Sequence, residues 1–155
     1  MLGREHAAGH PALTDEYTGL ANRLHFELVY GYLFNGADRG VPMVLMLVSV
    51  GGESDRDGLR ALGELFRAIS RSADLVSHLG RGRFAVLMLG TNMMGAQVGA
   101  DRFLDMLEGK TPGTVSIGLA NFQPHMKESS QLLEAAEKAL QDAEAAGGGL
   151  EMAPT

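Results

Sequence analysis

Apolar residues follow two different spacings along the 155-residue chain. In four segments they recur every three or four positions, which predicts helices with one apolar face. In four others they form continuous runs or alternate with polar residues, as in strands. The predicted helices are 22–34, 54–69, 95–107 and 129–146, and the predicted strands are 41–50, 75–79, 84–89 and 115–120.

Polar residues and glycines mark the ends of these elements. Ser54, with Asp57 three positions later, predicts a capping box at the start of the second helix. Ser129 or Ser130 is expected to cap the last helix, which the glycines at 147–149 should end. The apolar spacing of that helix predicts an inner face of Leu133, Ala136, Leu140 and Ala143.

The order of the elements indicates the class of fold. The run over 41–50 carries no charged residue and predicts a buried central strand. The next two strands are joined by Gly80–Arg83, a glycine-rich turn typical of a hairpin. We therefore expect an α/β (α+β) domain, in which helices surround a central mixed sheet that contains a β-hairpin. This domain should span 15–148, with tails at 1–14 and 149–155.

Composition narrows the class of protein. Apolar residues make up 45% of the chain and charged residues 21%, which excludes wholesale disorder. The chain has no cysteine, so disulfides, thiolate metal sites and thiol nucleophiles are excluded. The longest apolar run, Met43–Val48, is too short to span a membrane. Residues 1–10 lack the apolar centre of a signal peptide. We expect a cytoplasmic domain, which is either a whole protein or a domain cut from a longer chain, as its plain tails would allow.

The charge is spread unevenly along the chain. The net charge of −6 argues against a protein that coats nucleic acid, so no DNA partner is expected. The segment Arg56–Arg102 nevertheless contains seven arginines and four acidic residues, a local balance of +3 that leaves −9 for the rest. Such a segment could surround an anion site, although arginines on a solvated helix surface would give the same count.

Several separate segments resemble one known family, the GGDEF domains of diguanylate cyclases. Asp15–Arg23 is similar to the family opening D-x-L-T-G-L-x-N-R, and Thr114–Ala120 resembles its strand T-x-S-I-G-[VL]-A. Asp74–Leu87 resembles the segment around the name-giving motif, and the last helix resembles A-D-x-A-L-Y-x-A-K-x-x-G. The likeness covers about 15–148 and implies the palm-like fold of nucleotidyl cyclases.

The resemblance also shows what this chain lacks. The family joins two GTP molecules into cyclic di-GMP with metal ions, and hard cations need carboxylate oxygens. Active members carry two acids in the turn G-G-[DE]-E-F, and both acids are absent here. We expect the two arginines of this turn to be solvated, and the alternative is that they bind an anion. The residues in this turn are Gly80, Arg81, Gly82, Arg83 and Phe84.

The first strand lacks its acid as well. The positions most like the family's D-[LIF]-D are Val48, Ser49 and Val50. The F-K-x-I-N-D-x-x-G-H stretch, which contacts guanine and phosphate in the family, is replaced by the shorter link 51–57. The resemblance therefore implies an inactive member, without catalytic residues, metal ligands or a cofactor. The five histidines show no metal-ligand spacing either.

One family feature is retained. Arg71 and Asp74 form an R-x-x-D pattern five residues before the turn, where active members bind the inhibitory product, cyclic di-GMP. Arg102 stands where a further arginine of the family's site lies, on the helix after the hairpin. An arginine can donate two hydrogen bonds to guanine O6 and N7, and a carboxylate accepts from guanine N–H groups. Alternatively, Arg71 ends a helix, where a cation is favourable, and simply pairs with Asp74.

These observations lead to one expected function and two alternatives. We expect a cyclic di-GMP receptor domain that uses Arg71, Asp74 and Arg102 and signals to a protein partner or an attached domain. The first alternative is a protein-interaction or homodimerisation module that ignores nucleotides. The second is residual cyclase activity, which the missing acids disfavour.

Overall fold

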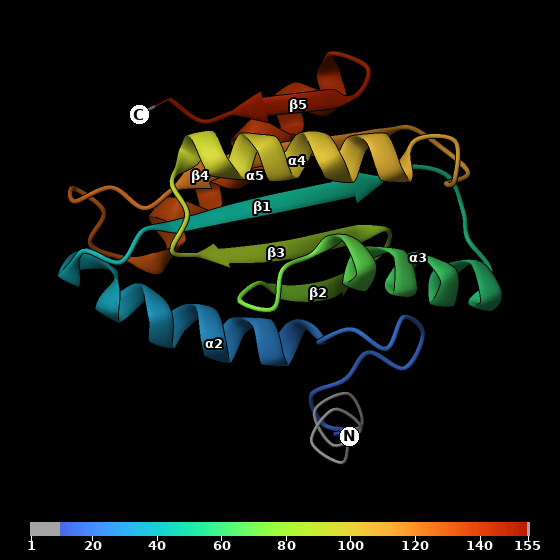
Figure 1. Ribbon diagram of the computed structural model, residues 1–155, viewed down its shortest axis with the longest axis horizontal. Helices are drawn as coiled ribbons and strands as arrows, with labels where there is room; N and C mark the ends of the chain where they lie inside the picture. The colour runs from blue at the N-terminus through green and yellow to red at the C-terminus, as the bar shows by residue number, and fades with distance from the viewer. Residues whose placement is uncertain (1–9, 155) are drawn as a thin grey trace.

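The protein is described by a computed structural model that covers residues 10–154, so most of the expected N-terminal tail lies outside the described residues. Figure 1 shows a five-stranded sheet with helices on both faces. The helices are α2 (Arg23–Gly36), the 3₁₀ turn η1 (Ala37–Arg39), α3 (Arg56–Ile69), α4 (Met93–Leu107) and α5 (Ser129–Ala145). The strands are β1 (Met43–Val50), β2 (Leu75–Gly80), β3 (Arg83–Leu89), β4 (Val115–Asn121) and β5 (Gly149–Met152).

The sheet has the strand order β2-β3-β1-β4-β5. Three neighbouring pairs are antiparallel and β4 and β5 are parallel, so the expected mixed sheet with a β-hairpin is confirmed. The apolar run in β1 is buried, as its lack of charge predicts. Strand β1 therefore lies at the centre of the domain, between β3 and β4.

The side chains of β1 alternate between two apolar cores. Val44, Met46 and Val48 point toward α3 and α4. In this core Phe66 of α3 stacks on Phe84 of β3, with their ring centroids 4.2 Å apart. Leu45 and Leu47 point the other way, into a core shared with α2 and α5. The sheet is thus covered on both faces, which explains why β1 reads as a continuous apolar run.

A glycine in β4 sets how closely α5 approaches the sheet. A Cβ atom on Gly118 would lie 2.3 Å from the backbone nitrogen of Leu140 in α5. Any larger residue would force α5 away from β4, because real Cβ atoms essentially never come so close. The strand resembling the T-x-S-I-G-[VL]-A pattern therefore needs its glycine for helix packing.

Two predicted helix caps are wrong. Helix α3 is capped by Asp55 instead of Ser54, and the Asp55 carboxylate accepts a 2.7 Å hydrogen bond from the Gly58 N–H. Helix α5 begins with a capping box between Glu128 and Gln131, so neither Ser129 nor Ser130 is the cap. In both helices an acidic neighbour of the predicted serine takes its place, and a carboxylate is well suited to the positive end of a helix.

The inner face of α5 is nearly as predicted. Ala136, Leu140 and Ala143 are buried, but Leu132 fills the first position and Leu133 is only partly buried. Leu132 lies four residues before Ala136 and is therefore directly in line with it on the helix.

The expected C-terminal tail at 149–155 is also wrong, because Gly149–Met152 form strand β5. Strand β5 runs parallel to β4 and pairs Ile117 with Leu150. Gly147, Gly148 and Gly149, the last of which begins β5, all have positive φ angles, from 91° to 115°, and turn the chain from α5 back to the sheet. A four-residue strand held by backbone pairing leaves little hydrophobic pattern, and for this reason the sequence did not predict it.

Candidate functional site

The predicted hairpin turn is present between β2 and β3. Gly80, Arg81 and Gly82 have φ angles of 94°, 55° and 74°, so three successive residues adopt left-handed backbone. The Gly82 carbonyl accepts a 2.8 Å hydrogen bond from the Val50 N–H at the end of β1. A Cβ atom at Gly82 would lie 2.5 Å from the Val50 carbonyl oxygen, so this position has no room for a side chain.

The structure brings together the two places where the family resemblance expects metal-binding acids. The strand register pairs Ser49 with Arg83 and Val48 with Phe84. Val48 is completely buried, and the Arg83 guanidinium lies 3.4 Å from Glu144 of α5. Arg81 and Arg83 are both exposed, as expected.

The side chains at the positions of the family's acids do not fit a divalent metal ion, because Val48, Gly82 and Arg83 offer no side-chain oxygen ligand. Among residues 10–154, no three His, Asp or Glu side chains gather in a way that could hold a metal ion. No metal-dependent step can therefore be derived from the side chains at this place.

Arg71 and Asp74 lie in the connection from α3 to β2 and bind each other. The Arg71 guanidinium is 3.0 Å from the Asp74 carboxylate at its closest, and the Arg71 backbone N–H donates to the same carboxylate at 2.9 Å. The Asp74 N–H donates in return to the Arg71 carbonyl at 3.0 Å. The Asp74 side chain is only 2% exposed, whereas that of Arg71 is 46% exposed. The ion pair between Arg71 and Asp74, which the sequence analysis gave as the alternative to a ligand site, is therefore present.

This pair borders a surface groove of about 600 Å³. The loop 13–21, the end of α3 and the start of β2 form its walls. Arg67 also lines the groove and donates a 2.6 Å hydrogen bond to the Gly19 carbonyl. The groove thus carries two arginines, one of them paired with a buried carboxylate, and offers donors for an anion and an acceptor for N–H groups.

Arg102 belongs to a different element from Arg71 and Asp74. It is an exposed residue of α4 and is not among the residues that line the groove of Arg71 and Asp74. The structure thus brings together two of the three residues that the sequence assigned to one site.

A second polar pair was missed by the sequence analysis. The Asp15 carboxylate accepts hydrogen bonds from the Thr18 N–H at 2.8 Å and the Thr18 hydroxyl at 2.7 Å. It also lies 3.0 Å from Nδ1 of His78, a buried residue of β2. The two partners are 63 positions apart, so no local pattern could have paired them.

This pair carries an electrostatic signature. Burial alone would raise the pKa of the Asp15 carboxyl, but the hydrogen bonds from Thr18 and the neighbouring His78 lower that pKa below its ordinary value. The other side of the His78 ring packs against Phe84 of the hairpin, with centroids 4.8 Å apart. Its Nε2 atom is buried without a hydrogen-bond partner among residues 10–154. The opening motif is therefore anchored to the strand that leads into the turn.

Solved structures with the same fold support this description. The GGDEF domain of FimX from Pseudomonas aeruginosa is 23% identical, with a TM-score of 0.79 over 90% of this chain and 98% of that chain. The GGDEF domain of DgcB from Caulobacter crescentus in complex with c-di-GMP is 20% identical, with a TM-score of 0.77 over 92% and 96%. The diguanylate cyclase SiaD from Pseudomonas aeruginosa, in complex with its activator SiaC, is 21% identical, with a TM-score of 0.82 over 99% and 66%.

Sequence comparisons show the family. A search of curated proteins finds no significant match. The family model described as diguanylate cyclase, GGDEF domain, matches residues 12–149, which is most of the chain. The matched segment includes all four motif-like segments, of which one contains the hairpin, and the Arg71–Asp74 pair. The chain therefore belongs to the GGDEF domain family.

Proposed function

We propose that this GGDEF domain has lost cyclase activity and acts as a receptor that binds cyclic di-GMP through Arg71 and Asp74. The observation that carries the proposal is the groove of about 600 Å³, in which these two residues offer an exposed guanidinium beside a buried carboxylate. Strand β2 separates Asp74 from the hairpin turn by about 17 Å, at roughly 3.3 Å per residue. A change in the turn therefore leaves the Arg71–Asp74 pair intact.

The chemistry of the groove suits a guanine-containing anion. The Asp74 carboxylate can accept from guanine N1–H and N2–H, while Arg71 can donate to O6 and N7. Without a ligand, Arg71 satisfies Asp74 and also donates to the Leu89 carbonyl at 3.3 Å. Binding then exchanges these contacts for contacts with the ligand, whereas the bond from the Arg71 backbone N–H can remain. Arg67 adds a second positive charge for the phosphates.

The proposed loss of cyclase activity rests on the end of β1 and the hairpin. Gly82 and Arg83 occupy the motif positions that carry acids in active members, and Val48 replaces an acid in β1. The Val50 carbonyl fills the space that a side chain at Gly82 would need. On incubation with GTP and Mg²⁺, we expect chromatography to show no cyclic di-GMP, and its formation would contradict this part of the proposal.

Isothermal titration with cyclic di-GMP tests the binding. We expect saturable heat for the unchanged chain and a loss of affinity of about tenfold or more in Arg71→Ala and Asp74→Ala, since a bidentate contact with a base is worth about 1–3 kcal/mol. Arg60→Ala, an exposed position of α3 that does not line the groove, is the matched control and should bind as the unchanged chain. Absence of heat, or equal affinity in Arg71→Ala, would contradict the proposal.

Arg102 is tested in the same titration. It does not line the groove, so it can contribute only if the ligand extends beyond the groove onto α4. A fall in affinity for Arg102→Ala would support the three-residue site, whereas unchanged affinity would limit the site to Arg71 and Asp74.

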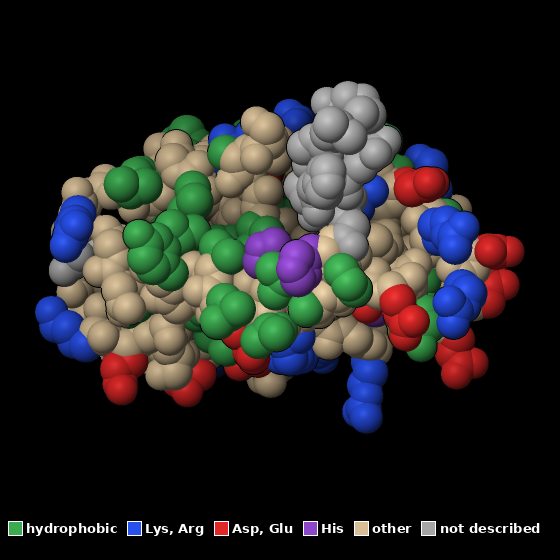
Figure 2. Space-filling model, turned by 90° about the horizontal axis from the view of Figure 1, so that it is seen from below, with side chains coloured by type: hydrophobic (Ala, Val, Ile, Leu, Met, Phe, Trp, Pro, Cys, Tyr) green, Lys and Arg blue, Asp and Glu red, His purple; other side chains and the backbone are tan. Residues whose placement is uncertain are grey.

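A second candidate function, a protein-interaction or homodimerisation module, is favoured by the outer face of α2. Leu24, Leu28 and Tyr32 are four residues apart and are 50%, 59% and 80% exposed, so they form one apolar stripe. Figure 2 views the molecule from the side of α2 and shows hydrophobic side chains gathered across this face. A receptor needs such a surface to pass its signal to a protein partner or an attached domain.

The stripe distinguishes the two functions. Sedimentation of the chain with and without cyclic di-GMP shows whether it self-associates, and Leu28→Glu should abolish any association that uses the stripe. An association that requires the stripe and ignores cyclic di-GMP would favour the interaction module, whereas one that changes with the ligand would favour the receptor.

A further inference from the structure

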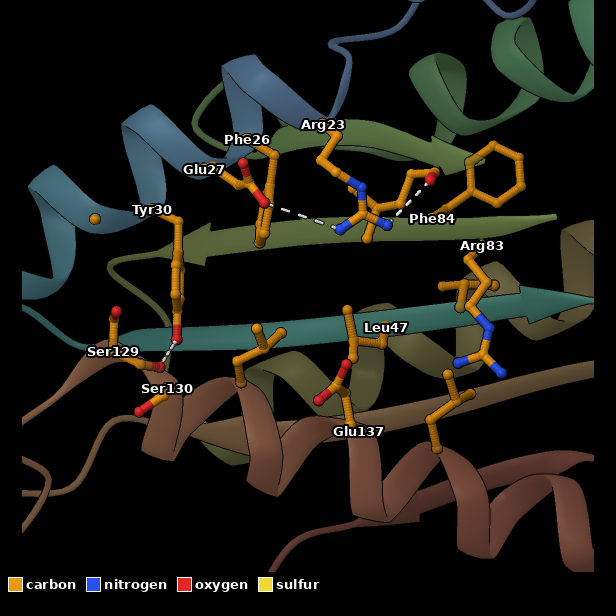
Figure 3. A pocket seen from close by; sticks show the side chains of 15 residues that line it. Arg23, Phe26, Glu27, Tyr30, Leu47, Arg83, Phe84, Ser129, Ser130 and Glu137 are labelled. Carbon is orange, nitrogen blue, oxygen red and sulfur yellow. Dashed lines mark hydrogen bonds and ion pairs between the residues drawn. The ribbon is translucent and has the colours of Figure 1, made fainter. Parts of the chain in front are cut away.

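A second cavity lies on the other side of the molecule from α3. It measures about 320 Å³ and opens between α2 and α5, above the sheet face that carries Leu47 (Figure 3). It shares no lining residue with the groove of Arg71 and Asp74. Its volume is within the range of sites for small organic molecules, about 300–1,000 Å³. A largely apolar, ligand-sized space thus lies away from the proposed cyclic di-GMP site, with Leu79 and Arg83 of the hairpin strands in its lining.

The walls of this cavity are aromatic and aliphatic. Phe26 and Tyr30 of α2 stack with centroids 5.3 Å apart, and Leu133 and Leu140 of α5 also line the cavity. The Tyr30 hydroxyl donates to the Ser129 carbonyl, so the ring is held in place and its oxygen can still accept. The cavity therefore offers a fixed surface against which a flat apolar group can pack.

A glycine keeps one wall open. Gly31 lies within α2 and lines the cavity, and a Cβ atom there would meet nothing within 4 Å. Packing does not explain this glycine, which is a poorer helix former than any residue except proline. Its effect is to leave the cavity mouth unobstructed.

The charged side chains at the rim of the cavity differ in whether they are paired. Arg23 lies 3.9 Å from Glu27 and donates to the Leu79 carbonyl, and Arg83 lies 3.4 Å from Glu144. Glu137 points toward the cavity from α5 and has no ion-pair partner among residues 10–154. Burial raises the pKa of Tyr30, and the nearby Glu137 carboxylate raises it further. The rim charge left without an opposite partner is therefore negative.

We propose that this cavity binds a small organic cation, with a flat apolar body against Phe26 and Tyr30 and a protonated amine facing Glu137. The carboxylate supplies the opposite charge, and the aromatic faces stabilise both a planar ring and an adjacent ammonium group. Arg23 and Arg83 are each already paired, so an anionic ligand would have to compete with Glu27 or Glu144. The site is independent of the proposed cyclic di-GMP binding.

Three probes of nearly equal size and different charge test this class of ligand. Tryptamine is a cation, tryptophol is neutral and indole-3-propionate is an anion at pH 7. In ¹H–¹⁵N NMR spectra of the whole chain, we expect tryptamine to shift amides of α2 and α5 with a Kd of about 1 mM or lower, as its atom count allows. Tryptophol should bind about fivefold or more weakly, and indole-3-propionate more weakly still.

Single substitutions test the charge of Glu137 and the space inside the cavity separately. Glu137→Gln should reduce the tryptamine affinity to that of tryptophol, whereas Glu134→Gln, an exposed position on the same helix outside the cavity, should leave it unchanged. Gly31→Leu should block the cavity and remove the shifts, while Gly31→Ala should retain them. Absence of saturable shifts, tightest binding of indole-3-propionate, or unchanged binding in Glu137→Gln would overturn the proposal. Because cyclic di-GMP plays no part, these results do not depend on the proposed receptor function.

Discussion

The Val50 N–H donates to the Gly82 carbonyl at 2.8 Å, and this bond joins the central strand to the hairpin turn. The two backbones are so close that a Cβ atom at Gly82 would lie 2.5 Å from the Val50 oxygen. A carboxylate cannot be added at Gly82 without moving the strand or the hairpin. The backbone of the central strand therefore leaves no room for a side chain at the Gly82 position of the turn.

The first prediction concerns an attempt to restore the acid. Gly82→Asp should lower the free energy of unfolding by about 2–4 kcal/mol, because it adds overpacking to the strain of a positive φ angle. It should also produce no cyclic di-GMP from GTP and Mg²⁺. Urea denaturation and chromatography give the two measurements.

Gly80→Asp is the matched control in the same turn. Its φ angle is 94°, but a Cβ atom there meets nothing within 4 Å. It should therefore cost only the backbone strain, about 1–2 kcal/mol. Equal stability of the two variants would show that the contact with Val50 is not limiting.

The second prediction concerns the stability of the Arg71–Asp74 pair. Asp74→Ala should destabilise the chain by about 1–3 kcal/mol, because it leaves the Arg71 N–H without its acceptor. Arg71→Ala should cost less, about 0–1 kcal/mol, since its guanidinium is half exposed and the backbone bond remains. Urea denaturation measures both, and a larger cost for Arg71→Ala would contradict this account.

The third prediction concerns pH. The pKa of Asp15 is lower in the folded protein than its ordinary value of 3.8, so the ionised carboxylate stabilises the fold above that value. This contribution is lost as the pH falls below 3.8 toward the lowered pKa. Asp15→Asn should therefore be less stable than the unchanged chain at pH 7, and the difference should shrink in acid. Urea denaturation at pH 7 and at pH 3 tests this, and a difference that is constant with pH would be contrary to it.

The fourth prediction concerns two glycines within helices. Gly31→Ala should stabilise the chain by about 0.5–1 kcal/mol, because alanine favours the helix and its Cβ meets nothing within 4 Å. Gly63→Ala should destabilise it, since a Cβ atom there would lie 2.1 Å from the Thr18 carbonyl oxygen. Thermal unfolding of both variants compares the same substitution in an open and in a crowded position. Equal changes in Tm would contradict the close packing of Gly63 against Thr18.

Local patterns in the sequence predicted most of the fold. The structure has a strand at the apolar run of β1 and a hairpin turn at the glycines after β2. It also has a helix, α5, where the apolar residues show helical spacing. The R-x-x-D spacing likewise placed Arg71 and Asp74 side by side, because a turn of four residues is a local event.

Features that depend on distant parts of the chain were not predictable. Strand β5 exists because β4 offers a free edge, and the Asp15–His78 pair depends on how the opening loop packs on β2. Arg102 was assigned by counting along the chain, but its position relative to the groove depends on how α4 packs against the sheet. Each of these relationships is tertiary and leaves no periodic pattern.

The central claim is that the chain retains a cyclic di-GMP site at Arg71 and Asp74, away from the altered hairpin. Mapping ¹H–¹⁵N shifts during a cyclic di-GMP titration tests it most directly, because the method shows where the ligand binds. We predict saturable shifts at 67–76 and in the opening loop 13–21, with little change at 80–83, and their loss in Asp74→Ala. No shifts, or shifts confined to the hairpin and the end of β1, would contradict the account.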